Sequence, residues 1–200
     1  ILFIFPFMNR TSTVYKLSAW FYILRLCLQD LQLQRRQILK WSVLGALCIL
    51  MLTIQDVMMS QFRFSGATTD LAVAAIFLIG LYEGTENGSL FALIASIVYL
   101  FSGSSPGAQC IALIACPVVV LNLVRQSLWR RSGGSILLCT CAGIVFYEMM
   151  NFLFGMFQGI TIWDRAGVFA LVAGFTCAAA FPLYPIVKQI SKIGGETWKE

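Results

Sequence analysis

The sequence predicts an all-α, polytopic membrane protein, and two observations carry this prediction. Of its 200 residues, 59% are hydrophobic and only 12% are charged, whereas charged residues make up about 25% of a soluble globular protein. Long apolar runs also recur along the chain between short polar stretches. At about 20 residues for each crossing, the length allows about six transmembrane helices. A single membrane domain is therefore expected, with no room for a separate soluble catalytic domain.

Residues 1–34 are predicted to be an N-terminal extension. From Val14 to Leu33 the apolar residues recur at helical spacing, but charged residues interrupt them. Two interpretations stay open: an amphipathic helix at the membrane interface, or upstream sequence that does not belong to the mature protein. Residues 35–193 are predicted to form the membrane domain, and residues 194–200 a cytoplasmic tail.

The centre of the chain predicts a short helical hairpin. Its arms, Leu71–Tyr82 and Gly88–Phe101, are joined by the acidic turn Glu83–Asn87. Each arm covers roughly 18 to 21 Å, less than the hydrocarbon core of about 30 Å. Either flanking residues extend the arms to the interfaces, or the pair is a re-entrant hairpin buried among longer helices. Thr69 or Asp70 is expected to cap the first arm, because a short oxygen-bearing side chain satisfies free N–H groups.

Longer apolar runs on both sides of the hairpin predict the other membrane helices. Pro117 lies inside one of them and predicts a kink. The glycines at the end of the polar stretch 125–134 are expected to end a helical pattern. The four runs are Trp41–Gln55, Ala108–Val124, Ile136–Phe157 and Ala166–Val187.

The distribution of basic residues predicts the orientation. Six crossings leave both termini on one side, and cytoplasmic segments are rich in Lys and Arg. On one side lie Arg35, Arg36, Lys40, Arg125, Arg130, Arg131, Lys188, Lys192 and Lys199; on the other lie only Arg63 and Arg165. Both termini are therefore expected in the cytoplasm. The net charge of +5 is explained by this bias and does not predict a nucleic-acid partner.

Reactive side chains are scarce in the sequence. There is no histidine and no CxxC pair, so zinc-ligand spacing, histidine-based triads and metalloprotease motifs are absent. Six of the seven cysteines, all but Cys27, lie in predicted membrane helices, where cysteine acts as a small apolar residue. The sequence predicts no enzyme, no metal and no cofactor.

Glu148 is the only carboxylate deep inside one of the longer predicted membrane helices. Burying its charge is costly, so it must be paired, protonated or facing water. Asn151 follows three residues later and shares its helical face. One interpretation is a ligand contact or coupling site. The other is a neutral glutamic acid hydrogen-bonded to Asn122, Tyr147 or a backbone carbonyl.

A stripe of small residues marks the second arm of the hairpin. Gly88, Ala92 and Ser96 are spaced four residues apart, which allows close helix contact in lipid. The contact is either internal packing or a surface for a partner. Gly84 and Gly88 are expected to relax the backbone of the turn.

The order of these features resembles the MreD family of rod-shape-determining proteins of the bacterial inner membrane. The resemblance covers about four fifths of the chain. Four positions depart from the family pattern: Thr69 replaces a proline, Ala92 and Ser96 replace glycines, and Leu100 replaces an aspartate. The motifs that carry the resemblance are Arg35-Arg36, Gly66–Leu71, Tyr82-Glu83-Gly84 with Gly88, Ser105-Pro106-Gly107 and Tyr147-Glu148.

The resemblance implies a non-enzymatic scaffold for cell elongation in the bacterial cytoplasmic membrane. Its partners would be the bitopic protein MreC and, through it, the class B transpeptidase, the RodA glycosyltransferase and the MreB filament. The six-helix arrangement is also similar to the substrate-binding S-components of energy-coupling-factor vitamin transporters. Such a subunit should present several polar or aromatic side chains to a cavity, and the deep polar candidates are only Asn122, Glu148 and Asn151. The scaffold is therefore the favoured hypothesis.

Overall fold

The computed structural model describes residues 35–59, 68–102, 107–128 and 133–193, and these ranges contain six helices and no strand. The all-α prediction is confirmed. The predicted extension 1–34 and tail 194–200 lie outside the described residues. The helices are the N-terminal helix Arg35–Val57, α2 Leu71–Glu83, α3 Thr85–Phe101, α4 Gln109–Leu128, α5 Gly133–Phe157 and α6 Ala166–Ile193; the short helices η1 Gln55–Met59 and η2 Trp163–Arg165 accompany them.

Four of the helices are long and apolar enough to cross a membrane. They suggest a multi-pass membrane protein, as the composition predicts. Two helices, α2 with 13 residues and α3 with 17 residues, are shorter. Length and composition therefore support four of the six predicted crossings. The four long spans are Arg35–Val57, Gln109–Ser127, Gly133–Phe157 and Trp163–Lys192.

The short helix α2 forms the centre of the bundle. Every side chain from Ala72 to Ile79, and that of Leu81, has an exposed fraction of 0%. α2 contacts α3, α4, α5 and α6. A helix that is apolar all round is stable only when protein or lipid surrounds it, and here the protein does so. The outer helices instead expose large apolar side chains, such as Ile94 and Val120, as expected of surfaces that face lipid.

Two contacts fix how α2 lies against its longest neighbour. Glu83, at the last residue of α2, contacts Ser191 of α6, and Asp70, just before α2, contacts Thr176. The two helices are thus antiparallel. From Ala166 to Thr176, α6 extends about 15 Å beyond the start of α2. The N-terminus of α2 therefore lies inside the bundle.

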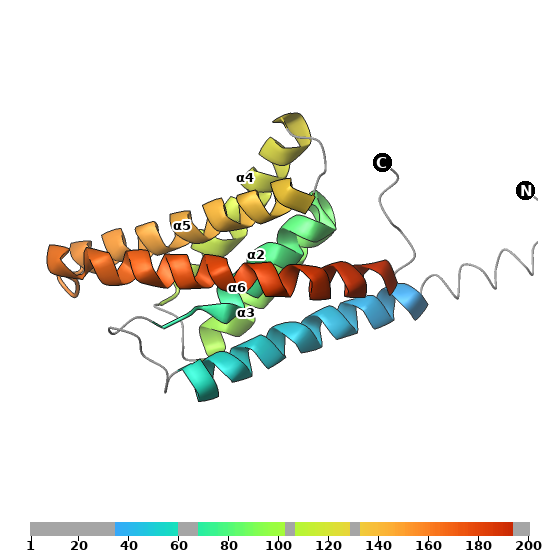
Figure 1. Ribbon diagram of the computed structural model, residues 1–200, viewed down its shortest axis with the longest axis horizontal. Coiled ribbons are helices and arrows are strands. Elements are labelled where there is room, and N and C mark those ends of the chain that lie inside the picture. The colour runs from blue at the N-terminus through green and yellow to red at the C-terminus, as the bar shows by residue number, and fades with distance from the viewer. Residues whose placement is uncertain (1–34, 60–67, 103–106, 129–132, 194–200) are drawn as a thin grey trace, which may run out of the picture.

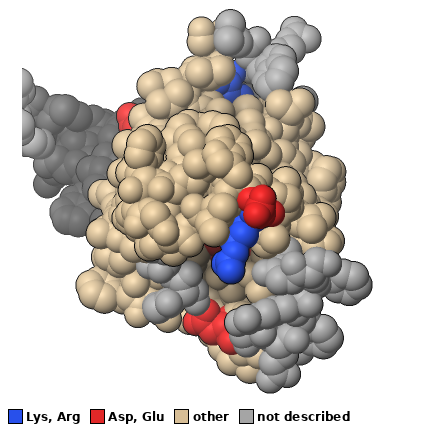
Figure 2. Space-filling view, turned by 90° about the vertical axis from the view of Figure 1, so that its left-hand side faces the viewer, with Lys and Arg blue, Asp and Glu red and all other residues tan. Residues whose placement is uncertain are grey.

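The long helices define the two ends of the molecule. α5 and α6 lie side by side, and the connection between them marks one end, while the start of the N-terminal helix and the end of α6 meet at the other (Figure 1). The end with the α5–α6 connection carries few charged atoms among the described residues (Figure 2). The predicted orientation of the chain in the membrane stays a prediction.

Two predicted helix boundaries are wrong, and in both cases a glycine explains the difference. The turn predicted over Glu83–Asn87 is a single residue, Gly84 with φ 89°, because this left-handed backbone reverses the chain at once and α3 begins at Thr85. Gly133 does not end a helix but begins α5. A Cβ at Gly133 would lie 2.3 Å from the hydroxyl of Tyr184, so a glycine is needed where α5 starts against α6.

Prolines do not end the membrane helices. Pro117 lies inside α4, and Pro182 and Pro185 lie inside α6, because neighbouring helices in a membrane bundle re-satisfy freed backbone groups. α6 therefore continues past its predicted end at Val187 to Ile193. Lys192 lies in its last turn, where a positive charge complements the helix dipole.

Candidate functional site

At its C-terminal end, which we call the Glu83 end, α2 is capped by side chains of α4. The last carbonyl groups of a helix have no partner within it. The Asn122 amide donates from Nδ2 to the carbonyl oxygens of Gly80 (3.0 Å) and Gly84 (3.3 Å). Arg125 donates from Nη1 to the carbonyl oxygen of Leu81 (2.6 Å). Both side chains are buried, and the positive charge of Arg125 complements the helix dipole.

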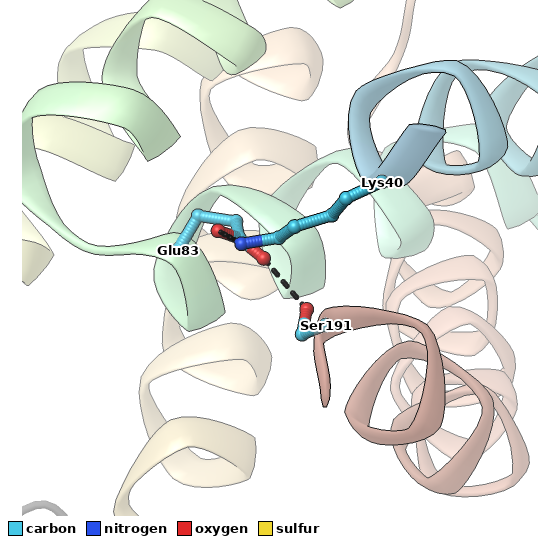
Figure 3. A network of polar contacts seen from close by, with 3 residues as sticks. All are labelled: Lys40, Glu83 and Ser191. Atoms are coloured by element: carbon cyan, nitrogen blue, oxygen red, sulfur yellow. Dashed lines mark hydrogen bonds and ion pairs between the residues drawn. The ribbon is translucent and has the colours of Figure 1, made fainter. Parts of the chain in front are cut away.

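Glu83 joins three helices at this end. Lys40 of the N-terminal helix forms an ion pair with Oε2 of Glu83, and Ser191 of α6 donates from Oγ to Oε1 at 2.6 Å (Figure 3). The side chain of Glu83 is 3% exposed and that of Lys40 is 15% exposed. Both carboxylate oxygens thus have a partner. The Glu83 end thus pairs its carboxylate with a lysine and a hydroxyl group.

The predicted stripe of small residues faces the interior. Gly88 is buried, and Ala92 and Ser96 have exposed fractions of 0%. A Cβ at Gly88 would lie 1.9 Å from the carbonyl oxygen of Gly80, so α2 and α3 approach each other as closely as their backbones allow. Of the two interpretations of this stripe, the structure places it in internal packing. With Gly84 at the turn, these candidate residues shape the hairpin.

At the other end of α2, which we call the Asp70 end, the predicted cap is confirmed for Asp70. Its Oδ1 accepts from the backbone N–H of Val73 at 3.5 Å, and its Oδ2 accepts from the hydroxyl of Tyr99 at 2.8 Å. The backbone N–H of Asp70 donates to Oγ1 of Thr176 at 3.0 Å. Oε1 of Gln55 accepts from the N–H of Ala72 at 2.9 Å.

α5 brings the other predicted residues to the same place. Glu148 is 6% exposed and lies within electrostatic range of Asp70. Tyr147 is 1% exposed, and its hydroxyl lies next to Tyr99 and Asn151. Yet the hydroxyl of Tyr147 and Oδ1 of Asn151 are buried atoms without an aligned hydrogen-bond partner among the described residues. We call Asp70, Tyr99, Tyr147, Glu148 and Asn151 the oxygen cluster.

Two of the hydrogen-bond partners expected for Glu148, Asn122 and Tyr147, do not pair with it. Asn122 lies at the Glu83 end of α2, so the predicted bond between Asn122 and Glu148 is wrong. Tyr147 is also not its partner, because the neighbours of the Tyr147 hydroxyl are Asn151 and Tyr99. Within the described ranges, no lysine or arginine pairs with Asp70 or Glu148. The cluster therefore offers oxygen atoms and no basic group.

The chemistry available to this cluster is limited. No group of three or more His, Cys, Asp or Glu side chains is placed to hold a metal ion in the described part of the chain. The cluster instead combines two carboxyl groups with phenol and amide oxygens. Sequence reasoning paired Glu148 with Asn151 but missed Tyr99 and Thr176, because these contacts join residues 29 and 106 positions apart from Asp70.

A second feature is an apolar groove between α4 and α5. Its volume is about 530 Å³ and its walls are almost wholly apolar. Ala112, Cys116 and Ala142 in its walls are exposed, so the groove opens on the outer surface of the bundle. The residues that line it are Ala112, Leu113, Cys116, Pro117, Val120, Leu121, Ala142, Gly143 and Phe146.

Comparison of the chain with protein-family models, with curated proteins and with solved structures found no match. The resemblance to the MreD family stays a prediction.

Proposed function

We propose that the chain is a non-enzymatic scaffold of the cell-elongation machinery in the bacterial cytoplasmic membrane. In this role it holds an MreC-type bitopic protein and, through it, the class B transpeptidase, RodA and MreB. The proposal starts from the sequence resemblance. The observation that supports it best is the filled interior of the bundle, where α2 from Ala72 to Ile79 is fully buried.

A filled interior favours a scaffold over a vitamin-binding subunit. A small-molecule site is a concave pocket with a few convergent polar groups. Here the polar side chains at the Glu83 end, Asn122, Arg125 and Glu83, are engaged in holding α2. The groove between α4 and α5 is concave but lacks polar walls. It suits a hydrocarbon surface better than a water-soluble vitamin.

We assign the transmembrane helix of the bitopic partner to this groove. In lipid, helices associate through close packing, and small residues let their backbones approach. The groove exposes Ala112 and Cys116 four residues apart on α4 and Ala142 on α5. In the stripe, Gly88 packs against Gly80 of α2, and Ala92 and Ser96 are fully buried, so the stripe cannot serve a partner without opening the fold.

The alternative, a substrate-binding subunit of an energy-coupling-factor transporter, is favoured by one observation. The oxygen cluster holds unpaired buried atoms on Tyr147 and Asn151, which a polar ligand would satisfy. This cluster is small and lies beside α2, so we rank the transporter second.

Co-purification tests the proposal. Ala142→Phe places a ring in the groove without touching the core, because Ala142 is exposed. Leu171→Phe is the matched control, since Leu171 is an exposed residue of α6 that does not line the groove. After mild detergent extraction from rod-shaped cells, we expect the unchanged protein and Leu171→Phe to retain the bitopic protein. Ala142→Phe should lose it at normal abundance.

Two results would count against the proposal. If Ala142→Phe retains the bitopic partner as well as Leu171→Phe does, the groove is not the partner surface. If the unchanged protein carries a small molecule and the energy-coupling subunits of a transporter in place of a bitopic protein, the transporter takes the place of the scaffold.

A further inference from the structure

The last turns of α6 present an apolar residue, an aromatic residue and two lysines on one face. Phe181, Tyr184, Lys188 and Lys192 are spaced three or four residues apart, so they share a face of the helix. Phe181 has an exposed fraction of 59%, both lysines are exposed, and Tyr184 is half-buried. We call these four residues the α6 stripe. At about 1.5 Å per residue, the stripe extends over roughly 16 Å along the helix.

Tyr184 fixes the stripe against the bundle. A Cβ at Gly133 would lie 2.3 Å from the Tyr184 hydroxyl, so this hydroxyl lies against the first residue of α5. The centroid of the Tyr184 ring is 6.4 Å from that of Tyr82 of α2, in an edge-on arrangement. Nζ of Lys188 lies 5.9 Å from the Tyr184 centroid, and the face of an aromatic ring attracts such a cation. The stripe is therefore a defined surface of the bundle.

The two lysines carry positive charge that the described part of the fold does not balance. Among the described residues, Lys40 forms an ion pair with Glu83, and neither Lys188 nor Lys192 has an acidic partner. Ser191, which lies between these two lysines in the sequence, contacts Glu83, but Lys40 already offsets the charge of that carboxylate (Figure 3). The end of α6 therefore offers a positive surface to a negatively charged group.

We propose that the α6 stripe binds an anionic phospholipid, with the phosphate of its headgroup at Lys188 and Lys192. The order of the residues fits such a molecule, because its acyl chains would lie along Phe181 and its glycerol esters at the level of Tyr184. Tyrosine favours this level of a membrane, where its ring has apolar surroundings and its hydroxyl reaches water. Each lysine near anionic lipid contributes a factor of about five in affinity. This site does not depend on the proposed scaffold function.

The apolar part of the stripe favours a lipid over an acidic protein segment or a free phosphate ion. Either of these would use the two lysines but would leave Phe181 without a role. α6 is long and apolar enough to cross a membrane, so the exposed ring of Phe181 meets lipid chains there. A single phospholipid can contact both parts of the stripe at once.

Thermal unfolding of the full chain in a neutral detergent tests this site. The protein is titrated with dioleoyl phosphatidylglycerol or with dioleoyl phosphatidylcholine, which has the same acyl chains but no net charge. A ligand that binds only the folded state raises the unfolding temperature in a saturable way. We expect such a rise with phosphatidylglycerol and no saturable rise at the same concentrations of phosphatidylcholine.

Lys188→Gln with Lys192→Gln removes both charges at positions where the side chains are exposed. About 25-fold more phosphatidylglycerol should then be needed for half of the rise, at a factor of about five for each lysine. Lys188→Arg with Lys192→Arg keeps the charges and should restore the response. Arg35→Gln with Arg36→Gln is the matched control, since these exposed arginines begin the N-terminal helix at the same end of the molecule (Figure 1). It should respond like the unchanged protein.

Each other outcome overturns the proposal. An equal rise with both lipids means a general effect of lipid on the detergent micelle. An equal loss of response in the lysine and arginine double variants means diffuse attraction to the whole basic end, and a normal response of the glutamine variant of the lysines places the lipid elsewhere. An equal rise with sodium phosphate alone means a site for a free anion. No rise with either lipid assigns the lysines to another partner, such as an acidic protein segment.

Discussion

Both ends of α2 have backbone groups without a partner inside the helix, and different side chains bind them at each end. At the Glu83 end, Asn122 and Arg125 donate to the last carbonyl groups, and Lys40 and Ser191 occupy the two oxygens of Glu83. At the Asp70 end, the free N–H groups are capped, but oxygen atoms of Tyr147 and Asn151 remain unpaired. Asn122 Oδ1 at the Glu83 end is likewise buried without an aligned partner among the described residues. The two ends therefore differ in charge: Lys40 and Arg125 lie at the Glu83 end, whereas the Asp70 end has carboxyl groups and no described basic partner.

This difference lies in which side chains satisfy the backbone groups at each end. A short helix buried in a membrane bundle must satisfy the backbone groups at both of its ends, because no water is available to do so. The Glu83 end meets that requirement and uses basic side chains to do so. The Asp70 end meets it with Asp70, Gln55 and Thr176, and the additional oxygens of Tyr147, Glu148 and Asn151 exceed it.

The largest expected effect comes from breaking the close contact near the Glu83 end. Gly88→Ala places a Cβ at 1.9 Å from the carbonyl oxygen of Gly80, which only a shift of the two backbones can relieve. Overpacking typically costs about 1 to 3 kcal/mol, and a clash with backbone should exceed this range. We expect little or no folded protein in fluorescence-detected size-exclusion chromatography.

The control for this variant is Gly174→Ala in α6, because a Cβ there meets nothing within 4 Å. Replacing an open helical glycine by alanine is expected to stabilise the protein by up to about 1 kcal/mol. Normal yield and elution of Gly88→Ala would contradict the contact between α2 and α3.

A smaller loss of stability is expected when the ion pair between Lys40 and Glu83 is broken. Lys40→Met leaves Glu83 with Ser191 as its described partner and a side chain only 3% exposed. Removing one partner of a buried pair costs about 3 to 5 kcal/mol, and we expect the lower figure because Lys40 is partly accessible to water. Unfolding titrations in sodium dodecyl sulfate would measure this loss.

The double variant Lys40→Met with Glu83→Gln gives the matching control. Glutamine carries no charge and its amide oxygen can still accept from Ser191. Most of the lost stability should return. An equal loss in the single and the double variant would mean that the ion pair does not stabilise the Glu83 end.

The smallest effect is expected at the Asp70 end. Tyr99→Phe removes the hydroxyl that donates to Asp70 at 2.8 Å, and a hydrogen bond between membrane helices contributes about 1 kcal/mol. Tyr147→Phe should cost less than Tyr99→Phe, because the Tyr147 hydroxyl lies next to Asn151 and Tyr99 without an aligned hydrogen bond to either. Unfolding titrations of the two variants side by side would show this contrast. Equal losses would mean that both hydroxyl groups serve the fold.

The sequence predicted those parts of this arrangement that depend on neighbouring residues. Asp70 is a cap because short oxygen-bearing side chains satisfy the first N–H groups of a helix, and the four-residue spacing of Gly88, Ala92 and Ser96 places them on one face. Glu148 and Asn151 share a face for the same reason. These are properties of one helix, and the structure places Asp70 at the cap and the small residues on one buried face.

The rest depends on contacts between distant segments, which a single sequence does not display. Tyr99, Thr176 and Gln55 reach the Asp70 end from three different helices. The predicted apolar run ends at Val124 and leaves Arg125 in a polar stretch, but Arg125 lies in the last turn of α4 and donates to the carbonyl of Leu81. The position of a charged side chain within a membrane bundle can be predicted only when its partner is known.

The central position of α2 is tested most directly by cross-linking the Glu83 end. In a protein without its native cysteines, Glu83→Cys is paired with Ser191→Cys or, as the control, with Gln189→Cys, which is exposed and points to another face of α6. A short bis-methanethiosulfonate reagent is added to membranes. The account predicts efficient cross-linking of positions 83 and 191, whose side chains now meet at 2.6 Å, and little of positions 83 and 189. Cross-linking of the control pair alone, or of neither pair, would contradict it.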